Sequence, residues 1–260
     1  SKRERGYYYE DPDFSINDIP LTEDELGAIS FAAKTLMQFR DVGMFQQFSS
    51  AIDKIVDRVS VSDDDADEFI QFEKSMSGEG NEFLTPILEA IKQQLVITFD
   101  YTSFVSGEMK PRKVLPLLLK EYSNRWYLIS FDLSKNTYIT YGLDRMEEVE
   151  VSKERMSRPA DFNADNFFKY AVGITSGNTP PEIVEFTAKT IAAKYIDSLP
   201  FHTSQKVIAM NDTGFTFSLE VNVSEELIRL ILSYGGDIKV LKPKSLKKEI
   251  ENRASAILKV

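Results

Sequence analysis

The chain has 260 residues, 42% of them hydrophobic, which is enough for two compact domains and excludes a disordered protein. It contains no cysteine, which excludes disulfides, thiolate nucleophiles and cysteine-ligated metals. With one histidine, the chain has almost no residues from which to build a histidine-based catalytic triad. The net charge is −10, and the sequence has neither an apolar run of membrane length nor a signal peptide, so we expect a cytoplasmic protein with no membrane contact.

The charge is distributed unevenly along the chain. Residues 1–88 hold 8 basic against 19 acidic residues, residues 89–155 hold 10 of each, and residues 156–260 hold 13 against 12. Within the neutral middle part, residues 110–145 contain seven basic and only three acidic side chains. This local basic patch on an acidic protein is suited to a small anionic ligand more than to long duplex DNA.

The first 88 residues read as a linker followed by helices. Thr22 and Glu25 form a capping box, and Leu21 and Leu26 a hydrophobic staple, so a helix is predicted to start there. Two amphipathic helices follow, with apolar positions at Leu26, Ile29, Ala33, Leu36 and at Phe45, Phe48, Ile52, Ile55, Val59. Their apolar stripes need a partner, which makes residues 1–88 a candidate dimerisation segment. The acidic run 63–68 lacks the glycine turn and final glutamate of a calcium loop, so we expect no metal there.

In residues 89–155 the spacing of hydrophobic residues changes from the helical period to a period of two. Strands are predicted at 95–101, 112–119, 125–131, 137–143 and 147–151, with turns such as Ser123-Asn124 between them. A helix followed by five short strands in about sixty residues indicates a small barrel of the Sm or SH3 type, because so small a sheet buries its faces best by closing on itself.

Residues 156–260 are predicted to form a third part. Their elements follow the order β-α-β-β-α-β with a final helix after Pro243, which is the order of a ferredoxin-like sandwich. His202 falls in a loop after a helix, where a structural role is favoured. The whole chain is therefore expected to be α+β, with helices, a five-stranded barrel and a ferredoxin-like domain in that order.

Four motifs carry a family resemblance. Residues 97–101 (ITFDY), 112–117 (RKVLPL), 125–128 (RWYL) and 141–146 (YGLDRM) resemble, in this order, the successive signatures of the WYL domain. The flanking motifs at 6–10, 21–26, 201–205 and 232–236 are similar to the linker and the C-terminal WCX extension of bacterial WYL transcriptional regulators. The resemblance implies that an N-terminal helix-turn-helix head is missing from this fragment.

The resemblance also implies a function. The WYL barrel would bind a nucleotide or a single-stranded nucleic-acid effector, and this would modulate binding of operator DNA by the absent head in a homodimer. The implied ligand-binding residues are Arg112, Tyr127 and Arg145, with Lys113 beside them. Arginine can hold a phosphate at two points, and tyrosine offers a stacking face. Many members carry an arginine or another polar residue in the fourth strand, where this chain has Ile139 and Gly142.

Two other functions stay open. The chain could be a structural dimerisation module that binds no small ligand, or an enzyme acting on nucleotides. For an enzyme, Asp144 and Glu147 are the only plausible acid-base or metal ligands, and nothing in the sequence sets them as a tuned pair. No phosphate-binding glycine loop is present. We therefore expect no catalytic residues, no cofactor, no bound metal and no enzymatic activity.

Overall fold

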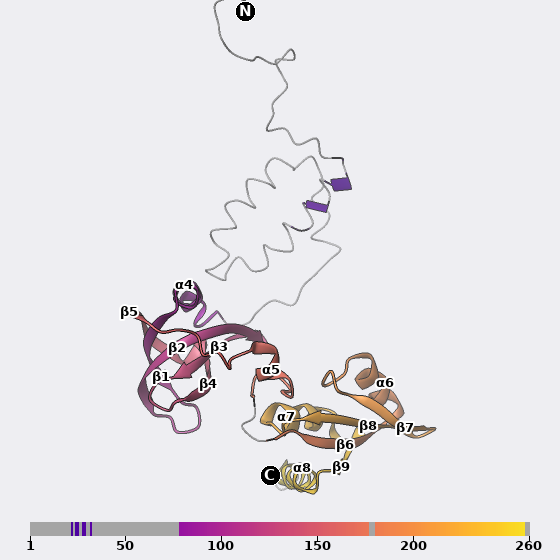
Figure 1. Cartoon of the computed structure of the whole chain (residues 1–260). Coiled ribbons are helices and arrows are strands. Elements are labelled where there is room, and N and C mark those ends of the chain that lie inside the picture. The colour runs from indigo at the N-terminus through magenta and orange to yellow at the C-terminus, as the bar shows by residue number, and fades with distance from the viewer. Residues whose placement is uncertain are drawn as a thin grey trace, which may run out of the picture. The chain divides into compact units, whose positions relative to one another are not determined.

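The structure is a computed structural model, and it describes residues 22, 24, 25, 28, 29, 32, 78–176 and 180–257 (Figure 1). The chain divides into two compact units, Ser1–Thr85 and Pro86–Val260. The predicted hydrophobic staple, the second amphipathic helix and the acidic run 63–68 lie outside the described residues.

The capping box in the first unit is confirmed. The Thr22 amide donates to Glu25 Oε2 at 2.8 Å, and the Glu25 amide donates back to Thr22 Oγ1 at 3.3 Å. Residues 24, 25, 28, 29 and 32 are helical, as the box predicts. The hydrogen bonds from Thr22 lower the pKa of the Glu25 carboxyl, because they stabilise its charged form.

The described elements from residue 81 onward are helices and antiparallel strands. They are η1 (Asn81–Phe83), α4 (Leu84–Gln93), β1 (Leu95–Thr102), β2 (Met109–Tyr122), β3 (Arg125–Asp132), β4 (Thr137–Gly142), η2 (Leu143–Arg145), β5 (Met146–Arg155), α5 (Ala164–Phe168), β6 (Glu182–Lys189), α6 (Thr190–Ser198), β7 (Lys206–Asn211), β8 (Gly214–Val221), α7 (Glu225–Ser233), η3 (Gly235–Asp237), β9 (Ile238–Lys242) and α8 (Lys244–Ile257). This confirms a mixed helix and sheet protein.

The first sheet has the strand order β4-β3-β2-β1-β5, and every neighbouring pair is antiparallel. Val114 and Leu115 are both buried although they face opposite ways, so both faces of β2 are covered. On one face, Leu115, Leu117 and Ile129 pack with Phe162 from the segment after β5. Among the strands described, no ladder joins β4 to β5, so hydrogen bonding does not close the sheet into a barrel.

The second sheet has the order β7-β8-β6-β9, again antiparallel throughout. Its core contains the stacked rings of Phe186 and Phe217, 5.3 Å apart and fully buried, together with side chains from α6, α7 and α8. Ser224 caps α7 by accepting a hydrogen bond from the Leu227 amide. In the part of the chain described, no helix combines the length and the apolar character needed to cross a bilayer.

Candidate ligand-binding site

Arg112 combines a charged side chain with a buried, unpartnered nitrogen. It lies on β2 directly opposite Phe99 of β1. Its Nε is buried and has no hydrogen-bond partner among the described residues. Buried polar groups in folded proteins are nearly always hydrogen-bonded, so an unpartnered guanidinium nitrogen indicates a position adapted to something other than the chain itself.

An open pocket of about 410 Å³ lies beside Arg112. Its wall comes from β1, β2, β5 and the turn after β3, and consists of Thr98, Phe99, Asp100, Pro111, Arg112, Lys113, Ser134, Glu148 and Glu150. Two cations and three carboxylates therefore share it. Such a wall can hold an anionic group at the arginine and accept hydrogen bonds from hydroxyl or amino groups at the carboxylates.

A buried acid and a buried tyrosine stand near Arg112. Asp132 is fully buried, and its Oδ2 accepts a hydrogen bond of 2.5 Å from the Tyr141 hydroxyl. Burial and this hydrogen bond raise the pKa of Tyr141, while the positive charge of Arg112 opposes the rise. The Tyr141 ring also meets the rings of Phe99 and Tyr101 edge to face, with centroids 5.3 and 4.8 Å away. These three rings therefore form one aromatic cluster, and Phe99 of that cluster lies directly opposite Arg112.

Arg145 belongs to a second group of charged and aromatic side chains. Its guanidinium lies over the rings of Tyr101 and Phe104, at 5.4 and 4.9 Å from their centroids. Asp144 contacts both Arg145 Nε and Arg125 Nη1 at 3.4 Å. Two guanidinium groups thus share one carboxylate, which leaves one net positive charge in what we call the Arg145 cluster: Arg125, Tyr127, Asp144 and Arg145.

Gly142 explains how Tyr127 joins this cluster. Tyr127 lies directly opposite Gly142 on the neighbouring strand. A Cβ at Gly142 would overlap Arg145 Nη2 and approach Arg145 Nε to 2.9 Å, so the guanidinium occupies the space that a side chain would fill. Burial raises the pKa of the half-buried Tyr127, and the charge of Arg145 opposes this rise. The glycine at this position of the fourth strand therefore makes room for the arginine that follows it.

The predicted site residues separate into two groups. Tyr127 pairs with Lys120 on β2, whereas Arg112 lies eight residues earlier on the same strand, opposite Phe99. Arg112 and Lys113 both line the open pocket, and Tyr127 and Arg145 lie together in the Arg145 cluster. Tyr141 and Tyr101 connect the two groups, since their rings are in contact and each senses the charge of one arginine.

Much of the predicted basic patch is neutralised by carboxylates. Lys113 pairs with Glu154 at 2.6 Å and Lys110 with Glu108 at 2.6 Å. With Arg125 and Arg145 on Asp144, four of the seven basic residues in 110–145 have an acidic partner. Glu108 and Glu154 both lie outside that stretch, so counting charges within it overlooked these two partners.

The sequence reading missed Asp132, Tyr141 and Phe104 as neighbours of the site. Tyr141 begins the YGLDRM motif, so the motif itself was a signal that its ring is positioned beside the arginines. Asp144 is occupied by two arginines, and its partner in the enzyme hypothesis, Glu147, is exposed. No group of three or more potential metal ligands occurs among the residues described.

Comparison with known proteins identifies two domains. The WYL domain model matches residues 82–151 and the WCX domain model matches residues 183–258. No curated protein matches the chain. Among solved structures, proteasome accessory factor B/C (PafBC) of Arthrobacter aurescens is 20% identical with a TM-score of 0.34, covering 91% of this chain and 35% of that one. A CRISPR Cas-related protein is 12% identical with a TM-score of 0.43, covering 67% of this chain and 49% of that one.

This chain spans about a third and about half the length of those two proteins. The WYL match contains the first sheet up to residue 151, with Arg112, Tyr127 and Arg145, and the WCX match contains nearly all of the second sheet. The chain belongs to the family of proteins that carry a WYL domain followed by a WCX domain.

Proposed function

We propose that this chain is the ligand-sensing and oligomerising portion of a bacterial transcriptional regulator. Its WYL domain binds a nucleotide or a short single-stranded nucleic acid, and the bound effector modulates DNA binding by a helix-turn-helix domain. The protein acts as a homodimer and is not an enzyme. The family supports the regulatory role, and the charged and aromatic groups on the first sheet support the class of effector.

The observation that carries the proposal is the unpartnered Nε of Arg112 beside an open pocket. A phosphate group can accept two parallel hydrogen bonds from a guanidinium through two of its oxygens, so a phosphate in this pocket would give the Arg112 side chain, which lines it, the partner that the described chain does not supply. The carboxylates of Asp100, Glu148 and Glu150 line the same pocket and can accept from ribose hydroxyls or from the amino groups of a base.

The Arg145 cluster would extend the site to a second nucleotide unit. Its net positive charge attracts a phosphate, and the ring of the half-buried Tyr127 offers a surface on which a base can stack. Lys113 contributes less, because Glu154 already pairs with it. A ligand with two or more phosphates joined through a sugar that carries a base can contact both arginines, which favours dinucleotides and oligonucleotides over a single nucleotide.

We also propose the finer fold assignments. The strand order β5-β1-β2-β3-β4 is that of an Sm-like sheet, and the order β9-β6-β8-β7 with two crossover helices is that of a ferredoxin-like domain. The chain would then comprise a helical segment over 1–88, the WYL domain over 89–155 and the WCX domain over 156–260.

The test is a titration of the chain with short single-stranded DNA, short RNA and cyclic dinucleotides, followed by fluorescence anisotropy. We expect Arg112→Met to weaken the tightest of these complexes by about tenfold or more, the cost of a lost charged hydrogen bond, and Arg112→Met with Arg145→Met to weaken it further. Arg229→Met, on α7, is the matched control and should bind like the wild type.

Stability serves as the internal control of this experiment. Because Arg112 Nε has no partner in the described chain, Arg112→Met should not lower the melting temperature, and lost binding cannot then be attributed to unfolding. Equal binding by the wild type and the double variant would refute the assignment of the site. If neither protein bound any member of the panel, the proposed class of effector would be wrong.

A further inference from the structure

Phe104 is an aromatic side chain that the fold leaves in solvent. It lies in the loop between β1 and β2, and 69% of its surface is exposed. Of the phenylalanines in the described part of the chain, it is the one that is exposed, while the others are buried or half-buried. A phenylalanine contributes to stability mainly by burying its large ring, so a ring kept in water indicates a role outside the core.

The loop holds Phe104 in a fixed position. The Ser103 amide donates to the Glu108 carbonyl at 3.2 Å, and the Gly107 amide donates to the Ser103 carbonyl at 2.7 Å. Gly107 has a φ of 67°, in the left-handed region that glycine adopts without steric cost. These hydrogen bonds close the loop on both sides of Phe104, so little conformational freedom would be lost when a ligand contacts the ring.

Arg145 covers one face of the Phe104 ring. Its guanidinium carbon lies over the ring, 4.9 Å from the centroid, in a cation–π contact. An aromatic ring has two faces, and with 69% of the residue exposed the second face is accessible to solvent. Phe104 therefore presents a flat, uncovered surface directly beside the Arg145 cluster.

The same arginine retains hydrogen-bond donors for a phosphate. A guanidinium stacks through its face, whereas its N–H groups point outward in its plane, so the two interactions do not compete. Arg145 Nε is directed to Asp144 Oδ1 at 3.4 Å. Among the residues that the structure describes, none accepts a hydrogen bond from the two Nη atoms of Arg145. A ring surface and available donors therefore lie next to each other, as a base and its phosphate do in a nucleotide.

We infer that Phe104 is a base-stacking residue of the WYL domain. The uncovered face of its ring holds an unpaired base, while the Nη atoms of Arg145 donate to a phosphate of the same strand. The inference rests on the effector proposed above and adds a residue to its site. It narrows that effector to nucleic acid with at least one unstacked base, because the bases of a duplex already cover one another's faces. Any base can take this position, since each has a flat π face.

A simpler role for Phe104 would be to cover Arg145. Leucine is apolar and nearly as large, so it would also shield the guanidinium, but it has no flat ring on which a base can stack. Phe104→Leu therefore separates stacking from simple cover. Val105→Ala is the matched control, because Val105 is the next residue of the same loop, is also apolar and is 99% exposed.

The test is a fluorescence-anisotropy titration with two probes of equal length: a short single-stranded DNA, and a strand of abasic sites that keeps only the sugar–phosphate backbone. We expect Phe104→Leu to weaken binding of the DNA by about tenfold, as for loss of one stacked base, and to leave binding of the abasic strand unchanged. Phe104→Trp should bind the DNA at least as tightly as the wild type, and Val105→Ala should bind both probes like the wild type.

The possible roles of the ring give different results. DNA binding that Phe104→Leu leaves unchanged would overturn the inference and leave the proposed class of effector intact. Equal weakening for both probes would mean that the ring only supports Arg145, which would also overturn it. A wild type that binds neither probe would do the same, whereas the proposed class of effector fails only if the whole ligand panel fails.

Two further measurements complete the test. A duplex of the same sequence should compete poorly with the single strand, and a duplex that competed equally well would contradict stacking on an unpaired base. Because Phe104 is exposed, Phe104→Leu should keep the melting temperature of the wild type, so that a loss of binding is not a loss of folding.

Discussion

Asp132 shows how a single buried residue fixes the turn beside the candidate pocket. Its Oδ1 accepts hydrogen bonds from the amides of Ser134 and Lys135, both at 2.9 Å, and its Oδ2 accepts from Tyr141. An aspartate that binds the amides two and three residues ahead folds the chain back on itself, so it forms the turn between β3 and β4. Because Ser134 lines the pocket, the same carboxylate positions part of the pocket wall.

This arrangement predicts that a tyrosine-to-phenylalanine substitution lowers the free energy of unfolding more at Tyr141 than at Tyr138. Tyr141→Phe leaves Oδ2 of the fully buried Asp132 without its donor and should lower the free energy of unfolding by about 1–3 kcal/mol. Tyr138→Phe is the control: it removes a hydrogen bond of 2.7 Å to the exposed Asp161 and should cost less than about 1 kcal/mol. Urea unfolding of both variants measures the difference. Equal losses would mean that Asp132 finds another partner.

At this scale the sequence predicted the arginines of the candidate site but not the groups that contact them. Arg112 and Arg145 could be chosen because each sits inside a recognisable motif. Asp132 was counted only as one acid in a basic stretch, and nothing local shows that it is buried. Tyr141 pairs with Leu128, four residues away from Asp132 along β3. Side chains stand roughly perpendicular to a sheet, so residues four apart meet only where the sheet is strongly curved. The local pattern of residues along a strand does not predict how strongly the sheet curves.

At the scale of elements, alternation predicted the nine strands that the structure describes and their order along the chain, while their ends were less accurate. The hairpin between β2 and β3 was predicted at Ser123-Asn124, and both residues have positive φ, 50° and 60°, as a two-residue turn that matches the strand twist requires. Strand β2 extends further than predicted, over Met109–Tyr122. Pro116 does not end it, because the register shifts between Pro116 and Leu118, at a bulge where a missing amide is tolerated.

Helix α5 was not predicted, and its length gives the reason. It has five residues, Ala164–Phe168, too few for a helical period to be recognised against the background of the sequence. Asn163 nevertheless caps it by accepting from the Asn166 amide at 2.9 Å. Its Phe167 and Phe168 pack on the cluster around Leu117, so tertiary contacts stabilise what the local sequence alone does not specify.

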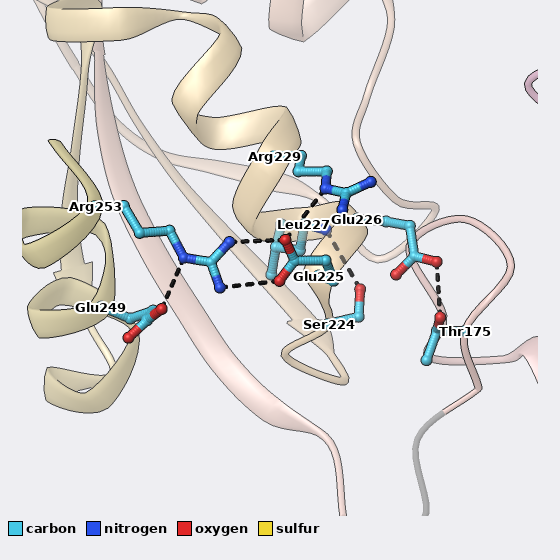
Figure 2. A network of polar contacts seen from close by, with 8 residues as sticks. All are labelled: Thr175, Ser224, Glu225, Glu226, Leu227, Arg229, Glu249 and Arg253. Carbon is cyan, nitrogen blue, oxygen red and sulfur yellow. Dashed lines mark hydrogen bonds and ion pairs between the residues drawn. The ribbon is translucent and has the colours of Figure 1, made fainter. Parts of the chain in front are cut away.

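An ion-pair network links helices α7 and α8 (Figure 2). Arg253 of α8 reaches both oxygens of Glu225 at the start of α7, at 2.7 and 2.9 Å, and also contacts Glu249 at 2.7 Å. The hydrogen bonds from Arg253 lower the pKa of the Glu225 carboxyl. Arg253→Met should therefore increase hydrogen exchange in α8. Lys247→Met is the control, because Lys247 pairs only within α8, with Glu251 at 4.0 Å.

The pH dependence of this link follows from the lowered pKa. A carboxyl with a depressed folded-state pKa contributes stability that is complete above its ordinary value, here 4.5, and is lost as the pH falls through the folded pKa. The difference in α8 protection factors between wild type and Arg253→Met should be constant near neutral pH and should disappear in acid below 4.5. A difference that persisted there would show that Arg253 acts through packing and not through its charge.

At the scale of the whole molecule, the protein is acidic and the two arginine groups on its first sheet are surrounded by carboxylates, so ligand affinity should depend only weakly on salt. The chain carries a net charge of −10, and four of the seven basic residues in 110–145 already contact carboxylates. A protein that coated its ligand with the entire patch would neutralise many phosphates and bind with a steep salt dependence. Two arginine sites that share their surroundings with acids can neutralise only a few.

We therefore expect the logarithm of the association constant for a short single-stranded DNA to fall with the logarithm of salt concentration with a slope of about −0.7 to −2, equivalent to roughly one to three phosphates. Arg112→Met should reduce the slope by about 0.7, and Lys113→Met should change it little, because Glu154 already neutralises that lysine. Anisotropy titrations at several salt concentrations measure these slopes. A slope steeper than about −4 would mean that the carboxylates release their lysines and arginines to the nucleic acid. The ligand would then be held by the whole basic stretch, and not by the two arginine groups on the first sheet.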